Sequence, residues 1–142
     1  MKLFLPSIAS LALLTLTAPG QAPATASPKA APHKDVTPDE AQKVIETTKD
    51  LVIIDVRTPE EFKDGHIAGA KNVSLLDADF DQKIKEYQGK PILLHCASGS
   101  RSARALTKMS DLRVPEIYHM NGGIKAWQSA GKGVVKDPPA VK

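Results

Sequence analysis

The 142-residue sequence contains one cysteine, Cys96, at the point where an apolar run, residues 92–95, gives way to small polar residues. A helix-like segment follows. The thiol is therefore predicted to face the free N–H groups and the positive dipole end of that helix, and both favour the thiolate. Cys96 is a candidate nucleophile, and Arg101 in the same stretch adds a positive charge that could help to hold an anion.

Cys96 could instead be a small core residue, because free cysteine is among the most buried residue types. Position alone leaves both interpretations open. The following residues favour a nucleophile, because none of them carries the large apolar side chain that a core segment would use. We interpret residues 96–102, named here the cysteine loop, as a tight backbone-lined loop that continues from Cys96 through Ala97, Ser98, Gly99, Ser100, Arg101 and Ser102.

Two charged residues, Asp55 and Arg57, lie at the end of a second apolar run, residues 51–55. Such groups can take part directly in chemistry. A buried ion pair that anchors neighbouring loops, with Glu60 or Glu61 as a partner, explains them more simply. We therefore predict that Asp55 and Arg57 support the site structurally.

The histidines nearest these residues are expected to be structural. His95 precedes Cys96 in a predicted strand, where neighbouring side chains point to opposite faces, so its ring is expected to lie away from the sulfur. His66, beside Gly65 in a predicted turn, is expected to bond to the backbone. The sequence shows no ligand cluster around either residue, and no metal site is predicted.

The elements that position these residues alternate along the chain. Short apolar runs rich in β-branched residues predict buried strands, and capping or helical spacing predicts the helices between them. The result is an α/β fold with a mainly parallel central sheet flanked by helices on both faces, in which sites lie at the carboxyl ends of strands. The predicted strands cover residues 51–55, 71–74, 91–95 and 114–119, and the helices 38–48, 58–62, 75–87, 101–111 and 124–130.

The N-terminal residues 1–26 have the pattern of an export signal: a positive start, an uncharged apolar stretch and a small-x-small sequence before the predicted cleavage. An uncleaved anchor is the alternative. Residues 27–35 have linker composition, residues 36–136 are predicted to form one domain, and residues 137–142 a tail. We expect a periplasmic or secreted protein with no stable membrane association after cleavage.

Composition limits the other functions. The chain has a formal net charge of +3 and 4% aromatic residues, and its charges are interspersed, so a nucleic-acid partner is not expected. One cysteine per chain excludes an intramolecular disulfide and a dithiol redox cycle.

Four segments in order resemble the single-domain rhodanese family of thiosulfate sulfurtransferases: residues 54–62, residues 65–72, the cysteine loop, and residues 121–127. The resemblance implies that Cys96 carries a sulfane sulfur as a persulfide and that residues 97–102 bind the donor. It implies no metal and no organic cofactor. The expected partners are a small-molecule sulfur donor and an acceptor, which could be cyanide, a thiol or a protein.

Two other functions stay open. Cysteine phosphatases and arsenate reductases separate cysteine and arginine by five residues, whereas four separate Cys96 from Arg101, and the shorter loop suits a sulfur atom better than a phosphate. The second alternative is a rhodanese-like sulfur carrier or binding module without turnover. Such modules often lose the cysteine, and its presence here favours an enzyme.

Overall fold

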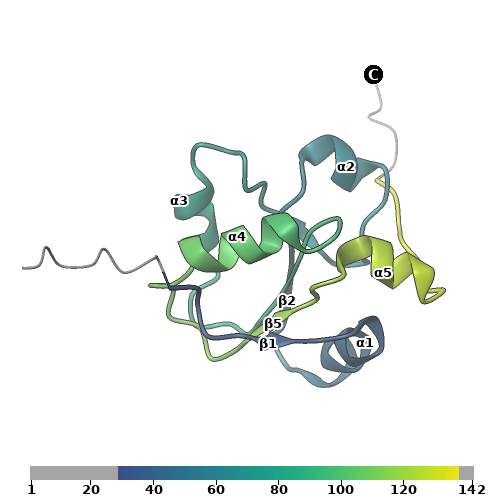
Figure 1. The fold of residues 1–142 in the computed structure, drawn as a ribbon, viewed down its shortest axis with the longest axis horizontal. Coiled ribbons are helices and arrows are strands. Elements are labelled where there is room, and N and C mark those ends of the chain that lie inside the picture. Colours follow the sequence, from purple (N-terminus) through teal and green to yellow (C-terminus); the bar gives the residue numbers. More distant parts are fainter. Residues whose placement is uncertain (1–28, 138–142) are drawn as a thin grey trace, which may run out of the picture.

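The computed structural model describes residues 29–137, which form alternating strands and helices (Figure 1). The predicted export signal and linker start, residues 1–28, and all of the predicted tail except Asp137 lie outside these residues. No helix within them combines the length and apolar character needed to cross a membrane. The elements are β1 (Lys34–Asp35), α1 (Pro38–Thr47), β2 (Val52–Asp55), α2 (Pro59–Lys63), β3 (Lys71–Asn72), α3 (Phe80–Lys85), β4 (Ile92–His95), α4 (Ser100–Lys108), β5 (Ile117–His119) and α5 (Gly123–Ser129).

The five strands form one sheet in the order β1-β5-β4-β2-β3, and every pair is parallel. The central strand, β4, is buried along its whole length, which explains why its sequence is a continuous apolar run and not an alternating one. The prediction of a mainly parallel α/β sheet is confirmed.

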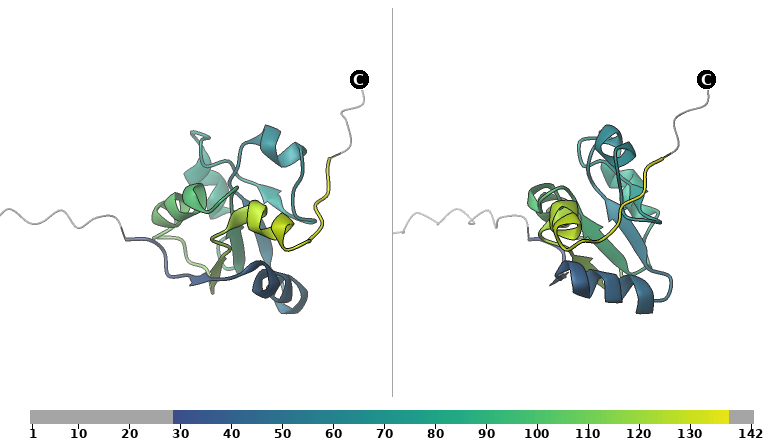
Figure 2. Two further views of the ribbon diagram at one scale, coloured as in Figure 1. Left: turned by 45° about the vertical axis from the view of Figure 1, so that its right-hand side comes forward. Right: turned by 90° about the vertical axis from the view of Figure 1, so that its right-hand side faces the viewer.

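The side chains of successive strand residues point into two separate hydrophobic cores, one on each face of the sheet. Ile54 and Leu94 pack into the core that holds Leu106 of α4 and Phe80 of α3. Ile53 and Leu93 point the other way, into the core with Ala41 of α1 and Trp127 of α5. Helices therefore cover both faces, as predicted. In both views of Figure 2, α1 lies at the lower edge, away from α3 and α4.

The two clearest predicted helix starts are present. Thr37 caps α1 and Thr58 caps α2, each with proline at the start of the helix. In both helices the carboxylate of the third residue, Glu40 or Glu61, accepts a hydrogen bond from the N–H of the capping threonine and closes a capping box. The second of these boxes fixes the side chain of a glutamate that reaches the cysteine loop.

The prediction that residues 27–35 form a linker is wrong at its C-terminal end. Lys34 and Asp35 form β1, which pairs with Tyr118 and His119 of β5 at the edge of the sheet. Ala31 is buried against the α3 and α4 core. The domain therefore begins before Val36. This two-residue edge strand is held by backbone pairing and by polar contacts of Lys34 with Glu116 and of Asp35 with His119, so it carries no apolar pattern for the sequence to reveal.

The helix predicted over residues 75–87 is shorter than expected, because α3 spans only Phe80–Lys85. Leu76, which fits the helical spacing, is 64% exposed. The segment before α3 turns instead, with the Asp77 N–H bonded to the Ser74 carbonyl and the Phe80 N–H to the Asp77 carbonyl. Only Phe80 and Ile84 of the predicted stripe lie in the core within the helix.

Candidate functional site

The site lies where three neighbouring parallel strands end. Asp55 of β2 pairs with His95 of β4, and Leu94 of β4 pairs with His119 of β5. Cys96 directly follows β4, the middle strand of the three. Because parallel strands share one carboxyl edge, residues far apart in the sequence meet around the sulfur.

The Cys96 sulfur is held by donors from its own loop. The Gly99 N–H donates to Sγ at 3.1 Å, and the Ser102 hydroxyl lies 3.4 Å from it. Cys96 is only 1% exposed and belongs to the core cluster beneath α4. Both sequence-based interpretations thus describe the same residue: it is buried, and its sulfur lies among hydrogen-bond donors at the start of a helix.

These contacts set the ionisation of the thiol. Burial by itself raises the pKa of Cys96, since it penalises the charged form. The Ser102 hydroxyl and the backbone N–H groups of Ser102, Gly99 and Ser98 together outweigh burial, so the pKa lies below its usual value. The thiolate is therefore favoured by hydrogen bonds to the sulfur.

Two glycines allow the loop to pack against the turn that precedes α5. Gly99 has φ +103°, and a Cβ there would lie 1.9 Å from the carbonyl oxygen of Asn121. Gly123 has φ +61°, and a Cβ there would lie 2.5 Å from the carbonyl oxygens of Cys96 and Ala97. The Ile124 N–H bonds to that Cys96 carbonyl at 2.9 Å. Gly99 and Gly123 thus shape the site, although neither of them reacts.

The Arg101 side chain is engaged by a carboxylate. Its Nη1 and Nη2 donate to the two oxygens of Glu61 at 2.6 and 2.7 Å, a bidentate pair across 40 residues. This bond is the main reason that the pKa of Glu61 falls to about 2. The sequence predicted Arg101 as an anion-binding group and placed Glu61 beside Arg57, whereas the structure joins Arg101 to Glu61.

Asp55 and Arg57 form the buried ion pair that the sequence suggested. The Arg57 guanidinium donates to both carboxylate oxygens of Asp55 at 2.6–3.0 Å. Its other contacts are backbone carbonyls, Glu61 at 3.1 Å and Gly65 at 2.8 Å. The pair therefore ties the end of β2 to the middle of α2 and to the turn that follows it, and α2 carries the glutamate that holds Arg101.

Neither His95 nor His66 is turned towards the sulfur. Nδ1 of His95 lies 3.1 Å from the Cys96 carbonyl, and its Nε2 lies 3.9 Å from Asp55. Burial lowers the pKa of His95, so the ring is neutral near pH 7. His66 bonds through Nδ1 to the Phe62 carbonyl at 2.9 Å and stacks on the Phe62 ring. Both rings organise backbone.

The loop residues predicted to bind substrate differ in exposure. Gly99 and Ser102 are buried, Ala97 and Arg101 are half-buried, and Ser98 and Ser100 are exposed. Ser100 opens α4, so the amide end of that helix lies at the loop.

Sequence reasoning missed His119 and Asp35. The Ser102 hydroxyl lies 2.8 Å from Nε2 of His119, and Nδ1 of His119 lies 2.8 Å from the Asp35 carboxylate. His119 ends a predicted strand, as Asp55 does, so its position was a usable signal. Asp35 gave none, because it was assigned to the linker.

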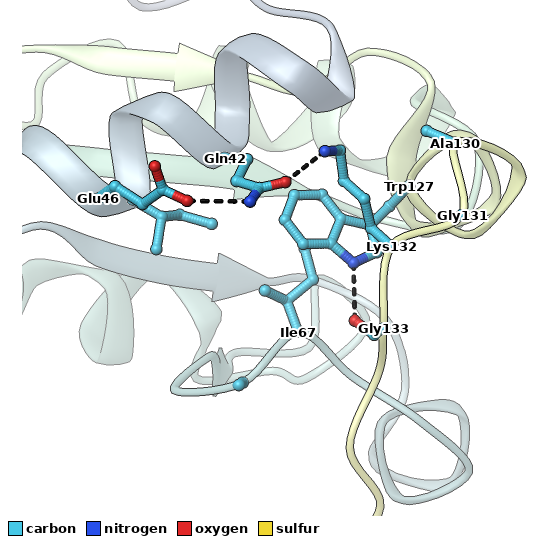
Figure 3. A pocket seen from close by; sticks show the side chains of 10 residues that line it. Gln42, Glu46, Ile67, Trp127, Ala130, Gly131, Lys132 and Gly133 are labelled. Atoms are coloured by element: carbon cyan, nitrogen blue, oxygen red, sulfur yellow. Dashed lines mark hydrogen bonds between the residues drawn. The ribbon is translucent and has the colours of Figure 1, made fainter.

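A groove of about 510 Å³ lies elsewhere, between α1 and the end of α5 (Figure 3). Its polar groups are bonded within the protein: Gln42 bonds to Glu46 and Lys132, and the Trp127 indole N–H donates to the Gly133 carbonyl at 2.9 Å. No residue of the cysteine loop lines it. The groove is therefore separate from the candidate nucleophile.

Comparison with known proteins identifies the family. The model of the rhodanese-like domain matches residues 37–130, which include the cysteine loop. The chain belongs to the rhodanese-like family. This confirms the resemblance found in the sequence.

The relatives of this rhodanese-like protein differ in length. It is 41% identical over 76 residues to YqhL of Bacillus subtilis, covering 53% of this chain and 59% of YqhL. It is 32% identical over 82 residues to the thiosulfate sulfurtransferase GlpE of Pseudoalteromonas translucida, covering 58% of this chain and 77% of GlpE. The chain thus spans less than two thirds of YqhL.

A solved structure gives the same result for the fold. A rhodanese-related protein from Thermoplasma volcanium matches with a TM-score of 0.64 and 28% identity, covering 74% of this chain and 100% of that one. The sheet and helices described here are therefore those of a rhodanese-like domain.

Proposed function

We propose that this protein is a sulfurtransferase that moves a sulfane sulfur from thiosulfate or a similar donor to cyanide or a thiol through a persulfide on Cys96. The observation that carries the proposal is the setting of the sulfur. The Gly99 N–H and the Ser102 hydroxyl lie at hydrogen-bond distance from Sγ, at the start of α4. Donors placed in this way stabilise a sulfur anion, whether thiolate or persulfide.

The reaction has two balanced steps. The Cys96 thiolate attacks the outer sulfur of thiosulfate, the sulfur–sulfur bond of the donor breaks, and sulfite leaves with the electron pair of that bond. The persulfide then carries one negative charge on its outer sulfur. Cyanide or a thiolate takes that sulfur and restores the Cys96 thiolate. An acceptor from outside is needed, because the chain has no second cysteine.

Arg101 contributes charge to the donor site. Glu61 accepts hydrogen bonds from both of its terminal nitrogens and holds the guanidinium in place. A guanidinium carries five N–H groups, so others remain for the oxygens of an anionic donor. We propose that Arg101 and the exposed amide end of α4 orient thiosulfate above Cys96.

Thiocyanate formation from thiosulfate and cyanide tests the proposal. The wild-type protein is expected to turn over, Cys96→Ser to lose all turnover, and Ser110→Ala, just beyond the opposite end of α4, to keep it. Urea unfolding of Cys96→Ser verifies that the fold survives. Wild-type protein that forms no thiocyanate, yet takes up sulfur on Cys96, would identify the carrier without turnover.

The phosphatase alternative has less support. Four residues separate Cys96 from Arg101, whereas cysteine phosphatases place five between the two. The shorter loop is a smaller cradle, which suits a sulfur atom better than a phosphate. Hydrolysis of an aryl phosphate by the wild-type protein, lost in Cys96→Ser, would favour that function over sulfur transfer.

We also propose that the protein works outside the cytoplasm. The support is the export-signal pattern of residues 1–26. Expression of the full chain in a bacterial host, followed by mass spectrometry of the periplasmic fraction, is expected to recover a protein that begins at Ser27. Recovery of the uncleaved chain in the cytoplasm alone would contradict the proposal.

A further inference from the structure

A continuous chain of side chains leads from the Cys96 sulfur to the protein surface. Sγ lies 3.4 Å from the Ser102 hydroxyl, which lies 2.8 Å from Nε2 of His119. Nδ1 of His119 lies 2.8 Å from the Asp35 carboxylate. Ser102 and His119 are buried, whereas the side chain of Asp35 is 60% exposed. The chain joins α4, β5 and β1, three elements that are distant in sequence.

The protons on Ser102 and His119 can be arranged in two ways. Ser102 has one hydroxyl proton and three neighbours that could accept it: Sγ, Nε2 of His119, and the Gly99 carbonyl at 3.0 Å. A neutral His119 that donates from Nδ1 to Asp35 leaves Nε2 as an acceptor, so Ser102 donates to the ring. A doubly protonated His119 donates from Nε2 to Ser102 and frees the hydroxyl to donate to the sulfur.

We propose that Ser102, His119 and Asp35 form a relay that receives the proton of the Cys96 thiol and holds it while the thiolate reacts. One proton leaves Sγ for the Ser102 oxygen, and the Ser102 proton moves to Nε2 of His119. Ser102 stays neutral, the sulfur becomes a thiolate, and His119 becomes an imidazolium facing Asp35. The inference rests on the proposed function only in assigning the thiolate as the attacking group. His119 and Asp35 act as positioning residues, through Ser102.

The groups around His119 favour a neutral ring, which is then able to accept a proton. Burial lowers the pKa of His119, and the Asp35 carboxylate opposes this effect. The His33 ring, from the segment that leads into β1, meets His119 edge to face at 5.6 Å and disfavours a second positive charge there. On the side of the sulfur, the Cys96 thiolate raises the pKa of Arg101, so these two charges attract each other.

The test is a titration of the Cys96 thiolate by its ultraviolet absorbance. The chain has one cysteine, so the thiolate signal has one source, and the method needs no access to a buried sulfur. His119→Gln is expected to reduce the ratio of thiolate to thiol near pH 7 about tenfold, a shift of about one pH unit. Asp35→Asn tests the same chain from its exposed end and is expected to reduce the ratio about threefold.

His33→Gln is the matched control. It removes an imidazole that lies 3.8 Å from Asp35 and is not bonded to Ser102. Because this ring disfavours a positive charge on His119, its removal is expected to leave the ratio unchanged or to raise it less than twofold, and not to lower it. All samples contain EDTA, because ligand atoms of His33, Asp35 and His119 lie within 4.8 Å of one another and a divalent cation could compete for the ring.

A double-mutant cycle separates a relay from a general electrostatic effect. In a Ser102→Ala background, His119→Gln is expected to change the ratio less than twofold, because the connection to the sulfur is already broken. An equal loss in both backgrounds, or no loss in the single variants, would overturn the relay. The titration reports only the ionisation of Cys96 and does not depend on sulfur transfer. Protein that titrates as expected but forms no thiocyanate and takes up no sulfur would refute the proposed function and leave the relay intact.

Discussion

Replacing Gly99 with alanine should damage the site through a contact that the structure locates directly. The new Cβ would lie 1.9 Å from the Asn121 carbonyl oxygen and 2.6 Å from its side-chain oxygen. The residue would also have to keep φ +103°, which costs an L-residue about 1–2 kcal/mol. Forcing atoms into a packed site adds about 1–3 kcal/mol. The free energy of unfolding should therefore fall by about 2–5 kcal/mol.

Gly69→Ala provides the matched control. Gly69 also has a positive φ, +81°, but a Cβ there would meet no atom within 4 Å. Gly69→Ala should lower the free energy of unfolding only by the cost of the positive φ, about 1–2 kcal/mol. The difference between the two variants in urea unfolding isolates the clash with Asn121. Because the Gly99 N–H lies 3.1 Å from the sulfur, Gly99→Ala should also raise the pKa of the Cys96 thiol, whereas Gly69→Ala should not. Equal losses of stability in the two variants would refute this description of the loop.

Two further predictions concern the ion pairs behind the loop. Arg57→Met leaves the fully buried Asp55 carboxylate without its partner and should lower the free energy of unfolding by about 3–5 kcal/mol; a loss under 1 kcal/mol in urea unfolding would contradict the buried network. Glu61→Gln should cost only about 0.5–1 kcal/mol at pH 7, because its pair with Arg101 is partly exposed. The pKa of Glu61 is about 2 in the fold and near 4.3 when unfolded, so the pair stabilises above pH 4.3 and this effect fades as the pH falls towards 2. Urea unfolding of wild type and Glu61→Gln at pH 7, 4 and 2.5 should therefore converge at the acidic end, and a constant gap would contradict the assignment.

Much of the fold is predictable because local rules agree with the tertiary structure. The apolar runs that become β2 and β4 need burial on both faces, and only a covered parallel sheet provides it. The threonine–proline starts of α1 and α2 depend on contacts within four residues. β1 is missing from the prediction, because contacts with the distant strand β5 form it. α3 is shorter than predicted, because Leu76 fits the helical spacing but is exposed.

The candidate site also has one part that the sequence predicts and one part that it does not. Cys96 and its loop are contiguous, so their residue types indicate both the candidate nucleophile and the helix start beside it. The partners of the loop come from elsewhere: Glu61 reaches Arg101 across 40 residues, and Asp35 reaches His119 across 84. Contacts of this kind depend on strand order. The sequence does not indicate β1, because residues 27–35 have linker composition, so Asp35 could not be placed.

The most direct test of the central claim is the mass of the intact mature protein after incubation with thiosulfate and removal of the excess. The account predicts one added sulfur atom on the wild-type chain, located on Cys96, released by cyanide and absent from Cys96→Ser. An unchanged mass with thiosulfate, polysulfide and persulfide donors alike, in protein that remains folded, would contradict it.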